Sequence, residues 1–351
     1  MSRFFSEKLR ELEAYVPGEQ PRGQKLIKLN TNESSFSPHP EVGKAVTEAS
    51  VRLNLYSDPE CRELREILGE KLGISPEELL ITNGSDEILN FAFMAFCDET
   101  HPALFPDITY GFYPVFARLN RVHFREIPLR EDLSIGLEDY ESLSGTVFLA
   151  NPNAPTGLAV GREGIRKLLE GRPDRLIVVD EAYVDFGGES CLPLIREYDN
   201  LLVTRTFSKS RSLAGLRLGF GAACPALIQD LKTLQYATNP YNVDALAQAA
   251  GIACLEADDY NSARMREMME IRGRTKAGLE RLGFQVTDSR ANFLFCSHPA
   301  FRGSALREAL RKKNILIRAE EDILINGALM AILGFLFGSL MGGAGLEPPL
   351  P

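Results

Sequence analysis

Short apolar runs alternate with helix-forming segments along most of this chain, and the alternation limits the folds open to it. Strands that are apolar throughout and separated by helices are typical of a buried, mostly parallel sheet. The pattern therefore predicts an α/β fold, in which ligands collect where the strands end. The strand-like runs are residues 147–150, 176–180, 201–204 and 216–223. The helical patterns lie at residues 59–72, 86–96, 162–169 and 245–282.

The length of the chain and the order of its segments predict a large domain followed by a smaller one. A chain of 351 residues with 44% hydrophobic content can bury an extensive core. We expect an N-terminal arm over residues 1–40, a large domain over residues 41–265 and a smaller α+β domain over residues 266–318. Residues 319–351 form a tail of different composition.

Charge and cysteine usage exclude several classes of partner. The net charge of −9 gives no basic surface of the kind that nucleic acids require. Six cysteines are scattered without CxxC pairs, and with only four histidines they indicate neither a zinc site nor a disulfide framework. The first 20 residues are charged and contain no continuous apolar run, so no export signal is evident. We predict a cytoplasmic protein with no metal.

The segment from residue 201 to residue 221 carries the most specific chemical signal. A strand-like run ends in Thr206-Phe207-Ser208-Lys209, and Arg217 follows eight residues after the lysine. A lysine just past a strand end, beside hydroxyls and an arginine, suits an imine with an aldehyde cofactor that carries a phosphate. Taken alone, the segment is also compatible with a solvated loop.

A helix start follows Asn83-Gly84-Ser85-Asp86-Glu87 and leads into the apolar run ILNFAFMAF. Gly84 permits a tight turn, and Ser85 can cap a helix whose first N–H groups have no partner within the helix. A helix start of this kind attracts phosphate. The alternative is a plain cap whose acidic residues complement the helix dipole.

Two further strand ends carry polar side chains. The motif NPNAPTG follows the run TVFLA and places Asn153 near a strand end, although an ordinary Pro/Gly turn has the same composition. Asp180 closes the run LIVVD, and Tyr183 lies three residues further on. A carboxylate buried there costs free energy unless a cation or hydrogen bonds compensate it. A structural salt bridge is the alternative explanation.

Together these side chains supply the groups that a pyridoxal 5'-phosphate site needs. Lys209 would hold the aldehyde, and Asp180 would keep the pyridine nitrogen protonated so that the ring accepts electrons. Asn153 and Tyr183 would donate to the ring phenolate. Tyr110, in FPDITYGFYPVF, would stack on the ring, although core packing also explains that aromatic segment.

The phosphate of that cofactor would be held by a second group of residues. Arg217 and Ser208 would bind it directly, together with the N–H groups that follow Gly84. The residues of that helix start which we expect at the cofactor are Ser85, Asp86 and Glu87.

The motifs of this chain resemble those of the histidinol-phosphate aminotransferases, a subgroup of the fold type I pyridoxal-phosphate aminotransferases. Their order and spacing carry the resemblance, which covers roughly residues 5 to 318. The motifs are AYVPGEQ (14–20), KLNTNES (28–34), LYSDPE (55–60), NGSDE (83–87), FPDITYGFY (105–113), NPNAPTG (151–157), VDEAYVDF (179–186) and TFSKSRSLAGLRLGF (206–220).

The resemblance implies a fold, a reaction and an assembly. The fold is that of a fold type I aminotransferase. The reaction is reversible amino-group transfer between L-histidinol phosphate and 2-oxoglutarate, with glutamate as the other amino compound, and Lys209 as imine residue and proton shuttle. The assembly is a homodimer in which Tyr56 reaches the partner's cofactor phosphate. The implied substrate-binding residues are Tyr15, Asn32 and Arg318.

Other activities share this cofactor frame. An aromatic amino acid aminotransferase and a threonine-phosphate decarboxylase are the alternative enzymes. A catalytically inactive protein that keeps the fold, or a membrane-tethered variant, are alternatives of another class. We do not expect a membrane partner.

Two departures from the family pattern stand out. Many relatives carry PNNPTG where this chain has Ala154 before PTG, so it is open which amide meets the phenolate, and we assign it to Asn153. Relatives also carry a stretch like LRITVGT after the segment matching residues 315–318. Here Met330 falls where its arginine would be, and no Lys or Arg follows Arg318.

The apolar tail has three explanations. Residues 323–346 are 24 residues without a charge, which is long enough for a transmembrane segment. The others are a buried strand with an irregular end, and a change of coding frame near residue 319, which we favour. Because an arginine binds a carboxylate with two hydrogen bonds and methionine cannot, we expect cofactor binding to survive better than transamination.

Overall fold

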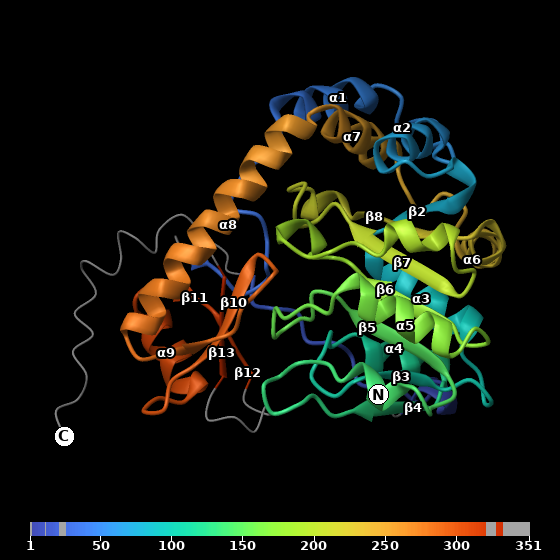
Figure 1. Ribbon diagram of the computed structural model, residues 1–351. Coiled ribbons are helices and arrows are strands. Elements are labelled where there is room, and N and C mark those ends of the chain that lie inside the picture. The colour runs from blue at the N-terminus through green and yellow to red at the C-terminus, as the bar shows by residue number, and fades with distance from the viewer. Residues whose placement is uncertain (1, 11, 21–25, 321–327, 333–351) are drawn as a thin grey trace.

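The computed structural model of the protein describes residues 2–10, 12–20, 26–320 and 328–332. Seven strands form a central sheet in the order β2-β8-β7-β6-β5-β3-β4 (Figure 1). In this sheet β8 runs antiparallel to both neighbours, and the other adjacent strands are parallel. The mostly parallel α/β sheet predicted from the sequence is confirmed. The strands are β2 (Leu79–Asn83), β3 (Ala103–Pro106), β4 (Phe124–Ile127), β5 (Thr146–Ala150), β6 (Ile177–Asp180), β7 (Leu201–Thr206) and β8 (Leu218–Ala223).

Both faces of the central sheet are buried, which explains why its strands read as continuous apolar runs. Along β5, Val147 and Leu149 belong to one hydrophobic cluster, and Phe148 and Ala150 belong to a second one, because successive side chains point to opposite faces. Helices α2, α5 and α7 bury side chains in the first cluster, and α3, α4 and α6 in the second.

The helices come in the chain order that the alternation requires. The α-helices are α1 (Pro40–Ser50), α2 (Arg62–Leu72), α3 (Ser85–Phe96), α4 (Tyr113–Asn120), α5 (Arg162–Gly171), α6 (Pro225–Thr238), α7 (Ala245–Glu256), α8 (Asp258–Arg281) and α9 (Gly303–Lys312). The 3-10 helices are η1 (Glu7–Leu9), η2 (Pro76–Glu78), η3 (Leu137–Tyr140), η4 (Val184–Phe186), η5 (Leu192–Arg196) and η6 (Ala214–Leu216).

The single helical pattern over residues 245–282 is two helices in the structure. Ala257 has a non-helical backbone (φ −87°, ψ 35°), and α8 then starts with two acidic residues in its first turn. The two helices also differ in surroundings, because α7 packs against α1 and the first cluster whereas α8 runs on to the smaller sheet (Figure 1). The domain boundaries that we predicted stay predictions, and the one at residue 265 falls inside α8.

A smaller antiparallel sheet with the order β12-β13-β10-β9 lies beside the C-terminal half of α8 (Figure 1). A third hydrophobic cluster joins α8 and β10 to Leu29 and to Tyr183. The N-terminal arm is tied to this region, because β1 (Ile27–Lys28) pairs in parallel with β11 (Ile315–Leu316). The strands of the smaller sheet are β9 (Gln285–Val286), β10 (Phe293–Ser297), β12 (Arg318–Glu320) and β13 (Ala328–Ile332).

Part of the unusual tail is a strand of this sheet. β13 pairs with β10 and with β12, and residue 330 is the register partner of Phe295 and of Arg318. Within the described ranges, no helix has the length and apolar character needed to cross a bilayer. The rest of the predicted tail, residues 321–327 and 333–351, lies outside the described residues.

Candidate active site

The ends of adjacent parallel strands bring the candidate residues together. Asp180 is the last residue of β6, and its register partners are Ala150 on β5 and Thr204 on β7. Lys209 follows three residues after the end of β7. Because the carboxyl ends of these strands meet at one edge of the sheet, their side chains converge there.

A pocket of about 90 Å³ lies at this edge. Eight of the eleven residues that we predicted for the cofactor line it: Ser85, Asp86, Tyr110, Asp180, Tyr183, Ser208, Lys209 and Arg217. Residues that we did not predict also line it: Ala150, Ala154, Ala182 and Thr206.

Asp180 is a buried carboxylate, 5% exposed, at one end of the pocket. It accepts hydrogen bonds from the Ala182 N–H (3.1 Å) and the Thr204 hydroxyl (3.2 Å). Burial, assisted by the negative charge of Asp86, raises its pKa to about 7. Among the described residues, no Lys or Arg forms an ion pair with it. A cationic group in the pocket would therefore find an uncompensated partner.

Lys209 shares the pocket with Asp180. Its Nζ donates to the Thr31 carbonyl (3.2 Å) and lies 5.7 Å from the centre of the Tyr183 ring. Burial lowers the pKa of this amine to about 8, and the charges of Asp86 and Glu33 oppose that shift. The amine is therefore easier to deprotonate than an ordinary lysine.

The other end of the pocket is built for an anion. The N-terminus of α3 opens there, with Ser85 and Asp86 in its first turn. The Arg217 guanidinium donates to the Ser208 hydroxyl (3.3 Å) and to the Asp86 carboxylate (3.0 Å). Glycine is favoured at position 84 because its backbone has φ +76°, a conformation that residues with a side chain rarely adopt.

Tyr110 and Tyr183 form two sides of the pocket. The Tyr110 hydroxyl donates to Asp86 (2.6 Å), and burial together with that carboxylate raises the pKa of the phenol. The Tyr183 hydroxyl accepts a hydrogen bond from the Asn32 amide (2.9 Å). Burial raises the pKa of Tyr183 as well, so both phenols stay protonated at neutral pH.

Asn153 and Glu87 are not among the lining residues. The Asn153 amide nitrogen donates to the Ile108 carbonyl (3.0 Å) and to Thr156 (3.2 Å), so its N–H groups are engaged. Its donation to a ring phenolate stays a prediction that this geometry does not favour. Glu87 accepts hydrogen bonds from the Asn83 backbone N–H (2.7 Å) and from the Asn242 amide, so it links the start of α3 to the end of β2.

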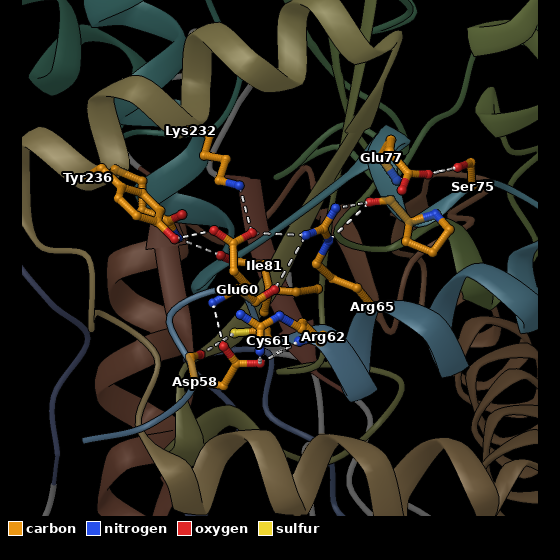
Figure 2. A network of polar contacts seen from close by, with 12 residues as sticks. Asp58, Glu60, Cys61, Arg62, Arg65, Ser75, Glu77, Ile81, Lys232 and Tyr236 are labelled. Atoms are coloured by element: carbon orange, nitrogen blue, oxygen red, sulfur yellow. Dashed lines mark hydrogen bonds and ion pairs between the residues drawn. The ribbon is translucent and has the colours of Figure 1, made fainter. Parts of the chain in front are cut away.

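Tyr56 also lies outside the pocket of its own chain. It is 83% exposed and stacks on Tyr241, with 4.4 Å between the ring centres. Figure 2 shows how the chain just after Tyr56 is anchored: Glu60 meets Lys232 (2.6 Å), Arg65 (3.3 Å) and the Tyr236 hydroxyl. The exposed ring thus projects from a segment held against α6.

A second pocket of about 240 Å³ adjoins the first and shares Lys209, Tyr110 and Tyr183 with it. All three predicted substrate residues line it: Tyr15, Asn32 and Arg318. The pairing of β1 with β11 explains this convergence, because it brings the N-terminal arm next to the chain that leads to Arg318. Arg318 Nη1 donates to the Tyr15 hydroxyl (3.3 Å), and Tyr15 stacks on Phe112 (4.2 Å between ring centres).

We did not predict a role for Thr31, whose carbonyl accepts from Lys209, or for Asn30 beside it. Their signal was the motif KLNTNES, which marked the resemblance without assigning these two positions. Any residue type can supply a backbone carbonyl, so the contact of Thr31 with Lys209 could not be predicted from the sequence.

This chain is similar to known aminotransferases in sequence and in fold. Residues 24–328 match the family described as aminotransferase class I and II. That match extends ten residues past Arg318, into the tail that we had set apart. A histidinol-phosphate aminotransferase of Acetobacter pasteurianus is 46% identical over 319 residues, which are 91% of this chain and 90% of that protein.

Two solved structures share the fold. The histidinol-phosphate aminotransferase of Sinorhizobium meliloti in complex with pyridoxal-5'-phosphate superposes with a TM-score of 0.84 at 22% identity, over 95% of this chain and 94% of that one. The L-threonine-O-3-phosphate decarboxylase of Porphyromonas gingivalis reaches 0.75 at 23% identity, over 88% and 94%. The fold therefore does not separate these activities, but the sequence match does place the family. This chain belongs to the class I and II aminotransferases, and within them to the histidinol-phosphate aminotransferases.

Proposed function

We propose that this protein is a pyridoxal-phosphate-dependent aminotransferase that transfers an amino group between L-histidinol phosphate and 2-oxoglutarate in histidine biosynthesis. One observation carries the proposal: the buried Lys209 amine and the buried Asp180 carboxylate converge in a single pocket whose far end carries Arg217 and the start of α3.

The pocket fits pyridoxal phosphate chemically. Asp180 is a buried carboxylate with a raised pKa and no cationic partner among the described side chains, so a protonated ring nitrogen would supply the missing charge. Arg217, Ser208 and the first N–H groups of α3 would hold a phosphate dianion. Tyr110 would pack against the ring between the two ends.

When bound, the cofactor supplies an electron-accepting ring that withdraws charge from the amino-bearing carbon of the substrate. Asp180 would hold a positive charge on the ring nitrogen. Lys209 Nζ would accept and return the proton of this carbon. Its pKa of about 8 leaves an appreciable fraction of free base near neutral pH.

The second pocket is the proposed substrate site. Arg318, oriented by the Tyr15 hydroxyl, would bind the anionic end of the substrate. Asn32 would act at the inner wall, where its amide already contacts Tyr183. We assign the soluble cytoplasmic compartment and a homodimer to the protein, with the exposed Tyr56 reaching the partner's phosphate site.

Two measurements test the proposal. Borohydride reduction with pyridoxal phosphate, followed by peptide mapping, should label Lys209, and the Lys209→Ala variant should lose the label and about a thousandfold or more of its activity. Lys232→Ala is the matched control. Amino transfer from histidinol phosphate should exceed that from phenylalanine and threonine phosphate. A wild-type protein without a label on Lys209 would exclude the proposed enzyme.

A second candidate is an impaired enzyme that binds cofactor but turns over slowly. Residue 330 is the register partner of Arg318, and it is methionine where the resembling family carries a carboxylate-binding arginine. The Met330→Arg variant should then raise the turnover with glutamate while cofactor affinity stays constant. Normal turnover of the wild type with glutamate would reject this candidate.

A further inference from the structure

A largely buried chain of polar contacts runs beside the pocket without lining it. We call it the Glu181 network, and its members are Glu181, Arg205, Asp185 and Ser210. None of the four is among the described residues that line the two pockets. Glu181 directly follows Asp180, and Ser210 directly follows Lys209. The network therefore connects the two chain positions on which the proposed function depends.

The core of the network is a buried ion pair. Arg205 donates to one oxygen of Glu181 through Nη2 (2.9 Å) and through Nε (3.0 Å). The Glu181 side chain is fully buried, and that of Arg205 is 14% exposed. Ser190 (2.8 Å) and the backbone N–H of Cys191 also donate to Glu181. The carboxylate is thus fully hydrogen-bonded.

The network continues from Arg205 to the residue after Lys209. Arg205 Nη1 lies 3.5 Å from one oxygen of Asp185. The Ser210 hydroxyl donates to the other oxygen of Asp185 at 2.5 Å. Ser210 is 3% exposed, whereas the Asp185 side chain is 29% exposed, so this bond lies at the edge of the buried network. The backbone of Lys209 is therefore tied through Ser210 to η4 and to the ion pair.

The register of β6 and β7 explains why the network sits there. Asp180 pairs with Thr204, and the hydroxyl of Thr204 donates to the Asp180 carboxylate. Successive side chains of a strand point to opposite faces. Arg205, the residue after Thr204 on β7, therefore points to the other face, where it meets Glu181, the residue just past the end of β6. Two side-chain contacts thus link the end of β6 to β7.

We propose that the Glu181 network is a positioning device that fixes the Lys209 amine relative to the Asp180 carboxylate. A buried ion pair contributes little net stability compared with apolar packing, whereas its geometry is specific. Fixed geometry is what a lysine needs if it must both hold the cofactor and move a proton. The proposal rests on the proposed function, because it assigns these roles to Lys209 and Asp180.

The test uses two mild changes, Asp185→Asn and Ser210→Ala, in the full-length protein. Both remove the link to Lys209 and leave the Glu181–Arg205 pair in place. Thr146→Val is the matched control, because it removes a buried hydroxyl that donates to the Phe96 carbonyl (2.6 Å) at the start of β5. The measurements are the dissociation constant for pyridoxal phosphate, the pH profile of borohydride labelling at Lys209, and the melting temperature of the cofactor-free protein.

We expect both network variants to bind pyridoxal phosphate about tenfold more weakly, as the loss of one charge-assisted hydrogen bond predicts, with a shifted pH profile. Their melting temperatures should fall no further than that of Thr146→Val. Wild-type affinity and pH profile in both variants would overturn the positioning role. A loss of affinity equal to that of Thr146→Val would also overturn it. An unlabelled wild-type Lys209 would instead reject the proposed function itself.

Discussion

Two networks of carboxylates and cations occupy different depths of this molecule. The Glu181 network lies against the sheet, where the Glu181 side chain has no exposure. The Glu60 network, which consists of Glu60, Arg65, Lys232 and Tyr236, lies at the surface around a carboxylate that is 22% exposed (Figure 2). Both networks pair a glutamate with arginine or lysine, yet the pKa of the glutamate shifts differently in the two.

The pKa values of the two glutamates move in opposite directions. Burial raises the pKa of Glu181, although Arg205 and its other hydrogen-bond donors act against the shift. At Glu60 burial also acts upward, but the hydrogen bonds and charges of Lys232, Tyr236 and Arg65 outweigh it and lower the pKa. The comparison teaches that the same pairing stabilises charge at the surface and only offsets desolvation in the interior.

The largest expected effect is the loss of the cation in the buried network. Arg205→Met leaves Glu181 buried without its counter-charge, which should lower the free energy of unfolding by about 3–5 kcal/mol. Urea denaturation of the cofactor-free protein measures it. Arg205→Lys, which keeps the charge, should recover part of the loss. Equal stability of Arg205→Met and the wild type would break the comparison.

Among the described residues, Asp180 is a buried carboxylate without a paired cation, unlike Glu181, and the pH dependence of stability tests this difference. The folded-state pKa of Asp180 is about 7, above its ordinary value of 3.8, so the folded state binds the extra proton between these values. The wild-type stability should therefore fall by a few kcal/mol as pH rises from about 4 to about 7.

The Asp180→Asn variant cannot ionise and should lack this component of the pH dependence in the cofactor-free protein. Denaturation midpoints at pH 5 and pH 8 for both proteins measure the difference. The same substitution should weaken pyridoxal phosphate binding, since the amide offers no negative charge to the ring. Identical pH slopes in both proteins would contradict the prediction.

For Glu60 in the surface network, the free energy of unfolding should change with pH in the opposite direction to that for Asp180, and by less. The pKa of Glu60 is lowered from 4.5, so its pairing contributes stability above that value, which is lost as pH falls through the folded-state pKa. The Glu60→Gln variant should be about 1 kcal/mol less stable than the wild type at pH 7. The gap should close in acid. A gap that widens on acidification would argue against the assigned direction.

The smallest effect is expected at Lys232. The Lys232 side chain is 29% exposed, and Glu60 keeps its contacts with Arg65 and Tyr236 when that side chain is removed. Lys232→Met should cost about 0.5 kcal/mol or less by urea denaturation, and less in 1 M salt. If Lys232→Met lowers the free energy of unfolding as much as Arg205→Met does, burial does not decide how much the cation of each network contributes to stability.

Much of the sheet was predictable because its strands are buried on both faces. Four of its strands were predicted within two residues at each end, whereas β2, β3 and β4 were not predicted. β4 is an edge strand, and Ile127 is the one buried residue among its four. Its sequence FREI therefore carries little apolar signal. β3 is four residues long and ends in a proline, which weakened its strand signal.

The sequence by itself determined which side chains stand at the strand ends. Asp180 ends one apolar run and Lys209 follows another, and the alternation of such runs with helices makes the strands parallel, so that their carboxyl ends meet at one edge. Only the tertiary structure decided how they are surrounded. The contact of Lys209 with Thr31, the engagement of the Asn153 amide by Ile108, and the pairing of Arg205 with Glu181 depend on how separate segments pack. Burial and counter-charges are properties of that packing, and they set the pKa values on which the chemistry depends.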